Sequence, residues 1–188
     1  MARPLATVII PARDESEQVL VELRYKLSTY SYAELKVIIV DDGSTSPISC
    51  AEIRHERPRG YGAAVKAGIT EAPTDCVIVM DGDGQHSHID AFRLLDAFLY
   101  FSPMDMMIGD RRLKETSWKR LWGRKMLNWT ATLFAGRWIA DLNSGMRIFK
   151  RHIVMGYLPI LSDQFSFTTS LTLSMLADGY RVDWLPIK

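Results

Sequence analysis

The sequence predicts an α/β domain in which a mainly parallel, twisted sheet carries helices on both faces. Three short apolar runs, at residues 5–10, 35–40 and 76–80, suit strands that are buried on both sides. Helical patterns lie between these runs, and alternating strands and helices fold with right-handed crossovers into such a sheet. The 188 residues, 47% of them hydrophobic, fit one domain that spans residues 1–188.

The individual elements follow from the spacing of apolar residues and from helix-breaking residues. Apolar side chains recur on one face of residues 17–30, and residues 62–69 are rich in alanine, so each stretch predicts a helix. The second half of the chain predicts three further helices and three further strands. The helices are expected at residues 88–100, 118–135 and about 167–178, and the strands at 104–108, 146–149 and 181–187.

Charge, cysteine content and hydropathy exclude several classes of protein. The 23 basic and 22 acidic residues give a net charge of +1, so charge alone predicts no nucleic-acid partner. Cys50 and Cys76 lack metal-ligand spacing and are interpreted as reduced thiols of a cytosolic protein. The N-terminus resembles no signal peptide, and no run approaches the ~18 apolar residues of a membrane-spanning helix. We therefore expect a soluble chain, or one that lies on a membrane surface.

Polar residues, most of them acidic, follow each of the three apolar runs. These segments are residues 11–15, Asp41-Asp42 and Asp81-Gly82-Asp83. Ligands of open parallel sheets bind beyond the carboxyl ends of the strands, so we expect the three segments to share one rim. Two carboxylates one residue apart can face one hard cation, with Gln85 as a neutral oxygen ligand and diphosphate oxygens beside it. The sequence thus predicts a Mg²⁺ or Mn²⁺ site, and the alternative is a solvated Asp/Gly turn.

A glycine pair, Gly60-Tyr61-Gly62, invites comparison with dinucleotide-binding loops. It fails that test because no strand precedes it and Val65 stands where glycine or alanine is required. We interpret the pair as the start of a helix that packs closely on the sheet.

A basic, tryptophan-rich stretch occupies the middle of the chain. Residues 111–125 contain seven basic residues against one acid, and four of the five tryptophans lie within residues 118–138. Such a composition suits phosphate head groups at a bilayer surface. The tryptophans and leucines also fall at helical spacing, so the stretch could equally be a helix packed on the core.

A second polar loop precedes the strand expected at residues 146–149. Residues 141–147 place Asp141, Asn143, Ser144 and Arg147 around a glycine. This composition suits a loop that holds an acceptor molecule, and a structural turn explains it about as well.

Four segments, at residues 8–15, 40–45, 60–64 and 81–86, together resemble the inverting GT-A glycosyltransferases of glycosyltransferase family 2. Within that family the chain is most similar to dolichol-phosphate mannose synthases and bacterial undecaprenyl-phosphate sugar transferases, over nearly its whole length. The resemblance implies the GT-A, Rossmann-like fold. It also implies metal-dependent, inverting transfer of a sugar from a GDP-mannose or UDP-hexose donor to a polyprenyl phosphate, at the cytoplasmic face of a membrane.

The resemblance also implies roles for residues at matching positions. Those that line the nucleotide site are Pro11, Ala12, Glu15, Val40, Asp42, Asp81 and Gly82. Those that hold Mg²⁺ or Mn²⁺ are Asp81, Asp83 and Gln85. Those implied on the acceptor side are Arg111, Arg124, Asp141 and Arg147, to which the composition of the loop at residues 141–147 adds Ser144. The catalytic set is then Asp83, Asp141, Arg111 and Arg124.

Two departures from the family pattern qualify these expectations. Gly82 stands where the family usually has alanine, which should loosen the turn without removing a ligand. The sequence also stops at Lys188, where relatives continue into a basic segment and often into membrane helices. We therefore expect either a catalytic domain that is truncated before a membrane-associated segment or one that depends on a membrane-embedded partner.

The expected mechanism is a single in-line displacement at the anomeric carbon. A lipid phosphate is already anionic near neutral pH and needs little base catalysis, so Asp141 is expected to orient groups. With a saccharide or protein hydroxyl as the alternative acceptor, Asp141 would be the candidate base. The Gln-x-x-Arg-Trp motif of polysaccharide synthases is absent, since Gly136-Arg137-Trp138 lacks the glutamine. A non-catalytic module that binds nucleotide-sugars is the alternative from another class.

Overall fold

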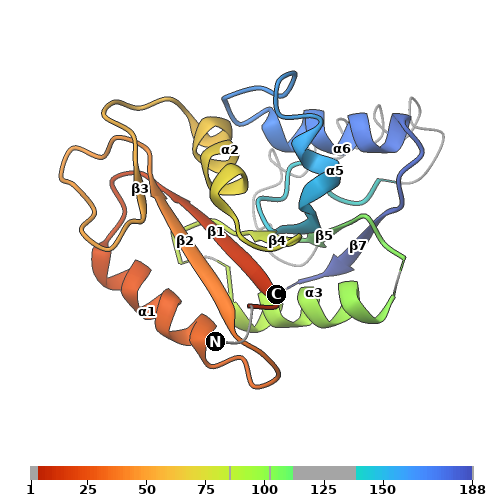
Figure 1. The fold of residues 1–188 in the computed structure, drawn as a ribbon, viewed down its shortest axis with the longest axis horizontal. Helices are drawn as coiled ribbons and strands as arrows, with labels where there is room; N and C mark the ends of the chain where they lie inside the picture. The colour runs from red at the N-terminus through yellow and green to blue at the C-terminus, as the bar shows by residue number, and fades with distance from the viewer. Residues whose placement is uncertain (1–3, 85, 102, 112–138, 188) are drawn as a thin grey trace, which may run out of the picture.

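A single seven-stranded sheet organises the computed structural model, which describes residues 4–84, 86–101, 103–111 and 139–187 (Figure 1). Within these residues the strand order is β3-β2-β1-β4-β6-β5-β7. The strands are β1 (Ala6–Ala12), β2 (Leu35–Asp41), β3 (Ile53–Arg54), β4 (Cys76–Val79), β5 (Met106–Asp110), β6 (Arg147–Lys150) and β7 (Val182–Pro186).

The sheet is parallel except at one strand. β1 pairs in parallel with β2 and β4, β2 with β3, and β5 with β7, whereas β6 runs antiparallel between β4 and β5. The mainly parallel sheet predicted from the sequence is therefore confirmed. Because β6 is reversed, with Arg147 opposite Val79 of β4, the loop before β6 meets the carboxyl ends of β4 and β5.

Helices cover both faces of the sheet, as predicted. Figure 1 shows α1 (Glu17–Ser28) and α3 (His88–Tyr100) on one face. The other face carries α2 (Tyr61–Glu71), α5 (Arg151–Met155) and α6 (Phe167–Ala177). The helix predicted at residues 118–135 lies outside the described residues. None of the described helices is long and apolar enough to span a bilayer.

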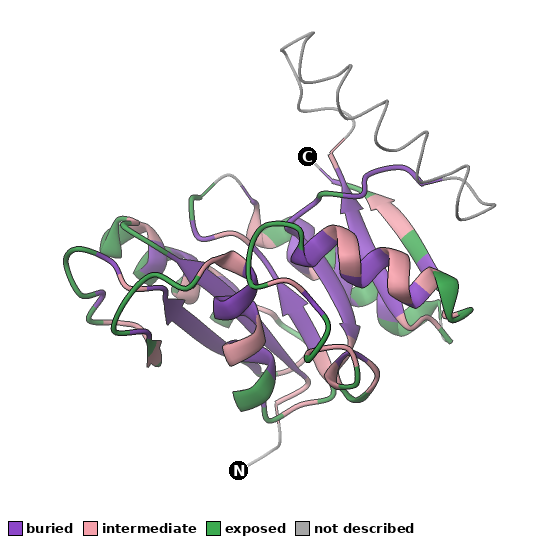
Figure 2. Cartoon of the chain, turned by 90° about the horizontal axis from the view of Figure 1, so that it is seen from above, coloured by how far each residue is buried: buried purple, intermediate pink, exposed green. Residues whose placement is uncertain are grey.

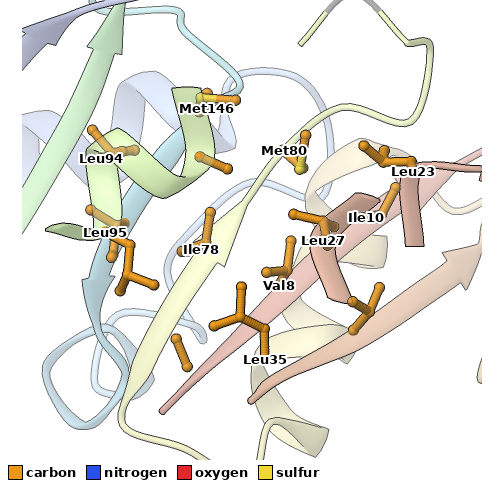
Figure 3. Packing of buried hydrophobic residues seen from close by; sticks show 14 of the residues in the cluster. Val8, Ile10, Leu23, Leu27, Leu35, Ile78, Met80, Leu94, Leu95 and Met146 are labelled. Carbon is orange, nitrogen blue, oxygen red and sulfur yellow. The ribbon is translucent and has the colours of Figure 1, made fainter. Parts of the chain in front are cut away.

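Strands β1, β2, β4, β5 and β6 are buried over most of their length, as the purple strands of Figure 2 show. Successive side chains point to opposite sides of the sheet, so both faces of these strands are covered. In β1, Val8 and Ile10 pack with α1 and α3 in one apolar cluster (Figure 3), and Ile9 packs with α2 and α6 in the other. This two-sided burial is the physical reason for the continuous apolar runs in the sequence.

Some boundaries differ from the sequence-based predictions. β1 continues through Pro11 to Ala12, although Pro11 was expected to end it. Within β1, only Thr7–Ile9 pair with β4, whereas Pro11 pairs with β2 alone. Pro11 therefore needs no amide hydrogen to bond to β4, and the strand can continue through it. β5 lies two residues later than expected, and the short elements β3 and α5 were not predicted.

Candidate active site

A cavity of about 850 Å³ opens at the sheet edge where the parallel strands end. Its walls come from the ends of β1, β2, β4 and β5, the start of α2, the loop before β6 and the loop before α6. The structure thus brings together the three polar strand ends that the sequence places separately. It adds the loop before β6, which the sequence singled out as a candidate acceptor loop, and the loop before α6, for which the sequence predicted no role.

The residues with sequence-predicted roles fall into three groups. Those that line the cavity are Pro11, Ala12, Glu15, Asp42, Asp81, Gly82, Asp83 and Arg111. Those that are buried and do not line it are Val40, Asp141, Ser144 and Arg147. Gln85 and Arg124 lie outside the described residues.

Asp81 follows β4 and is held by contacts on two sides. His86 Nε2 lies 3.1 Å from Asp81 Oδ2, and a Cβ atom on Gly145 would lie 2.2 Å from that same oxygen. Only glycine at position 145 therefore leaves room for the carboxylate. Burial raises the pKa of Asp81, but the hydrogen bond with His86 and the charges of His86 and Arg111 outweigh it and lower the pKa overall. Asp81 is thus an anion in a partly enclosed site.

Three carboxylates concentrate negative charge in the cavity. Burial raises the pKa of Glu15, and the charges of the neighbouring Asp83 and Asp81 raise it further. Among the described residues, no three His, Cys, Asp or Glu side chains form a metal-binding group. Asp81 and Asp83 nevertheless fit Mg²⁺ or Mn²⁺, because such ions commonly take one or two carboxylates and complete their shell with water and phosphate oxygens.

Asp42, at the end of β2, is bonded mainly to its own chain. Its carboxylate lies 2.7 Å from His55 Nδ1 and accepts hydrogen bonds from the amides of Arg59 and Gly60 at 2.9 and 2.7 Å. Burial raises the pKa of Asp42, but these bonds lower it overall. Asp42 lines the cavity and at the same time fixes the loop that leads into α2.

Arg111 reaches the cavity from the end of β5 and is held from behind by Asp141. Arg111 Nε donates to Asp141 Oδ2 at 3.1 Å, and the Arg111 side chain is 29% exposed whereas that of Asp141 is fully buried. The amide of Asn143 and the indole of Trp184 donate to Asp141 as well, to its carboxylate and its carbonyl oxygen. Asp141 therefore orients a guanidinium toward the cavity.

Arg147 is fully buried at the start of β6. Its guanidinium donates to the carbonyl oxygens of Ser144 and Thr168 and to the hydroxyl of Thr172. Burial lowers the pKa of Arg147 to about 10, which leaves it a cation at neutral pH. Direct contact of Arg147 and Ser144 with an acceptor stays a prediction, and their burial favours a supporting role that ties the loop before β6 to α6.

The loop before α6 contributes residues that sequence reasoning missed. They are Gln164, Phe165 and Ser166, to which Thr168 and Thr169 of α6 and Gly60, Tyr61 and Ala64 around the start of α2 are added. Arg13, Asn143 and Gly145 also line the cavity, and they belong to the segments 11–15 and 141–147 that the sequence had singled out. A Cβ atom on Gly62 would lie 2.2 Å from the carbonyl oxygen of Ser162 in this loop. The glycine pair did signal a close approach, but to this loop, and the glycine of α2 that packs on the sheet is Gly68, against Ile9.

The sequence of this chain matches known proteins over most of its length. Residues 7–158 match the family model described as Glycosyl transferase family 2. The chain is 29% identical over 189 residues to the undecaprenyl-phosphate 4-deoxy-4-formamido-L-arabinose transferase of Proteus mirabilis, covering 87% of this chain and 57% of that protein. It is 26% identical over 203 residues to the polyprenol monophosphomannose synthase of Mycolicibacterium smegmatis, covering 96% of this chain and 75% of that protein.

Solved structures share the fold at low sequence identity. The chain is similar to glucosyl-3-phosphoglycerate synthase from Mycobacterium tuberculosis in complex with Mn²⁺, UDP and phosphoglyceric acid, with a TM-score of 0.76 and 17% identity over 97% of this chain and 68% of that one. The same enzyme in complex with Mg²⁺ and UDP gives a TM-score of 0.75 and 18% identity. That match covers 98% of this chain and 70% of the enzyme. At such identity the likeness shows the fold alone.

Proposed function

Because the chain belongs to glycosyl transferase family 2 and has the GT-A fold, we propose that this glycosyltransferase moves a sugar from a nucleotide-sugar to a polyprenyl phosphate. The donor is of the GDP-mannose or UDP-hexose type, and transfer inverts the anomeric centre. One observation carries the proposal. The cavity at the sheet edge combines the Asp81 and Asp83 carboxylates with the guanidinium of Arg111.

The donor lies along the edge formed by β2, β1 and β4. Its nucleoside occupies the side of Pro11, Ala12 and Asp42, and its diphosphate lies beside Asp81 and Asp83. Mg²⁺ or Mn²⁺ held by these two carboxylates would neutralise the charge of the leaving nucleoside diphosphate. The structurally similar synthase was crystallised with Mn²⁺ or Mg²⁺ and UDP, which supports this assignment.

Arg111 positions the acceptor phosphate. A guanidinium presents a planar fork of donors that matches phosphate oxygens, and Asp141 fixes its orientation from behind. Asp141 itself is fully buried and bonded to Arg111, so its geometry suits an orienting role better than that of a base toward a hydroxyl. A phosphate acceptor needs no such base. The names of the Proteus and Mycolicibacterium relatives also point to polyprenyl phosphates.

The proposal includes a place in the cell. A polyprenyl acceptor is confined to a bilayer, so we place the chain at the cytoplasmic membrane face, as a peripheral protein or with a membrane-embedded partner. Arg124, the second proposed phosphate ligand, lies outside the described residues.

A transfer assay tests the proposal. The protein is incubated with Mn²⁺, a panel of nucleotide-sugars and one of three acceptors: a short-chain polyprenyl phosphate, the matching polyprenol, or an oligosaccharide. Product is expected only with the polyprenyl phosphate. Arg111→Lys should lower turnover by roughly 10- to 100-fold, because a point charge does not reproduce the fork. Arg93→Lys is the matched control, since Arg93 pairs with Asp90 on α3, away from the cavity.

Two outcomes would reject the proposal. Transfer to the oligosaccharide but never to the lipid phosphate would establish a hydroxyl acceptor. Saturable binding of a nucleotide-sugar with no product from any acceptor would establish a binding module without turnover.

A further inference from the structure

An exposed aromatic ring stands at the cavity, in the loop before α6. Phe165 is 78% exposed, yet its ring stacks on that of Tyr61 with centroids 5.3 Å apart and planes inclined by 17°. Both residues line the cavity. The stack fixes the orientation of the Phe165 ring while most of its surface stays open, so the ring is prepared to receive a flat apolar surface.

The place of this ring follows from the order of segments along the sheet edge. Asp42 follows β2, Asp81 follows β4, and Asn143 precedes the reversed strand β6, which is the next strand along. A nucleoside on the β1–β2 side and a diphosphate at Asp81 therefore direct the remaining part of the donor toward Asn143. Tyr61 links this position to Phe165, because Tyr61 lines the same cavity as Asp81 and its ring stacks on that of Phe165.

Polar, uncharged side chains line the same cavity as the aromatic ring. The hydroxyl of Thr169 donates to Asn143 Oδ1 at 2.5 Å, which holds that amide on the cavity wall. Gln164 Nε2 donates to the carbonyl oxygen of Arg59 at 3.1 Å and so anchors the loop beside Phe165. Hydroxyls and amides recognise the hydroxyl rim of a sugar, whereas an isoprenoid chain needs continuous apolar surface.

We propose that Phe165, supported by Tyr61, is the platform for the pyranose ring of the donor, and that Asn143 and Thr169 bind its hydroxyls. This inference rests on the proposed function and deepens it, because it assigns the group that recognises the sugar. A pyranose presents C–H groups on one face and hydroxyls around its rim. An open aromatic face, in one cavity with amide and hydroxyl groups, matches both features.

Paired binding measurements test the inference on the full chain with Mn²⁺ present. UDP and GDP are titrated alongside UDP-glucose and GDP-mannose into the unchanged protein, Phe165→Ala and Phe165→Trp. Phe165→Ala should weaken binding of the nucleotide-sugar by roughly tenfold and leave the affinity for the free nucleoside diphosphate within about twofold. Phe165→Trp should restore the nucleotide-sugar affinity. Ile160→Ala, which removes another exposed apolar side chain from the same segment, is the control and should change neither.

The possible results separate this inference from the proposed function. If Phe165→Ala weakened the binding of UDP as much as that of UDP-glucose, or of GDP as much as that of GDP-mannose, the sugar-platform role of Phe165 would be wrong. The ring would then merely shape the cavity. Unchanged nucleotide-sugar affinity, with turnover that falls only for longer polyprenyl phosphates, would assign the ring to the lipid chain and overturn the sugar-platform role too. An unchanged protein that binds none of these ligands would overturn both proposals.

Discussion

Asp42 has two structural roles, because it lines the cavity and also holds a loop of its own chain. The family resemblance implied that Asp42 lines the nucleotide site, and in the structure it does line the cavity. Its carboxylate is also the hub that holds His55, Arg59 and Gly60. The sequence showed where Asp42 lies in the fold, but the partners 13 to 18 residues further along the chain became visible only in the structure.

Asp42→Asn should therefore lower both stability and nucleotide binding. One carboxylate oxygen becomes an amide group that cannot accept from the backbone amides, and losing buried hydrogen bonds to a charged group costs about 1–3 kcal/mol each. We expect a lower free energy of unfolding in urea and a weaker affinity for nucleoside diphosphates. Glu22→Gln, at an exposed ion pair with Lys26 on α1, should leave both unchanged. If Asp42→Asn kept the free energy of unfolding and the nucleotide affinity of the unchanged protein, the proposed role of the Asp42 carboxylate would be wrong.

The same residue predicts a pH dependence. The pKa of Asp42 is lower in the folded protein than its usual value of 3.8. Its contribution to stability is thus fully present above that value and is lost as the pH falls through the folded-state pKa. Below about pH 4, the melting temperature of the unchanged protein should drop more steeply than that of Asp42→Asn. If the melting temperatures of the unchanged protein and of Asp42→Asn fell equally with pH, Asp42 would make no such contribution.

At the scale of elements, the most informative contact joins α2 to the loop before α6. Lys66 on α2 pairs with Asp163 at 2.8 Å, and the amide of Ala63 donates to the carbonyl oxygen of Asp163 at 3.0 Å. Gly62 makes this approach possible because it has no Cβ atom. The loop that carries Phe165 is therefore positioned by a helix about 100 residues earlier in the chain.

Gly62→Ala should disturb that loop. The added Cβ atom would lie 2.2 Å from a backbone oxygen of Ser162, so the loop must shift, and such overpacking typically costs about 1–3 kcal/mol. We expect a lower melting temperature and faster hydrogen exchange in residues 161–166. Gly156→Ala is the matched control, because its Cβ atom would meet its nearest neighbour at 3.5 Å, an ordinary contact. Equal behaviour of the two variants would contradict the close approach.

Local patterns explain which elements could be predicted. The strands that are buried on both faces could be predicted because each is a continuous run of apolar residues. The helix α3 could be predicted because its apolar residues recur on one face. β3 has two residues and α5 five, which is too short for any periodic signal. The extent of β1 beyond Pro11 depends on where the neighbouring strand β4 stops pairing, and no local pattern carries that information.

At the scale of the whole molecule, the reversed strand β6 completes the cavity. Parallel strand ends bring Glu15, Asp42, Asp81 and Asp83 to one edge, as the alternation of strands and helices predicted. The antiparallel β6 adds the loop with Asn143 and Gly145 to that edge. The sequence predicted a strand here but not its direction, which depends on long-range pairing. The wall formed by the parallel strand ends was therefore open to prediction, whereas the way in which the loops before β6 and α6 complete it was not.

The central claim is that Asp81 and Asp83 hold a nucleoside diphosphate together with a divalent cation. Calorimetric titration of UDP and GDP, in Mn²⁺ and then in EDTA, tests it most directly. We predict saturable binding in Mn²⁺, loss of that binding in EDTA, and an affinity roughly tenfold or more weaker in Asp83→Asn, whose side chain no longer carries the charge. Equal affinity in Mn²⁺ and EDTA, or unchanged affinity in Asp83→Asn, would contradict the account.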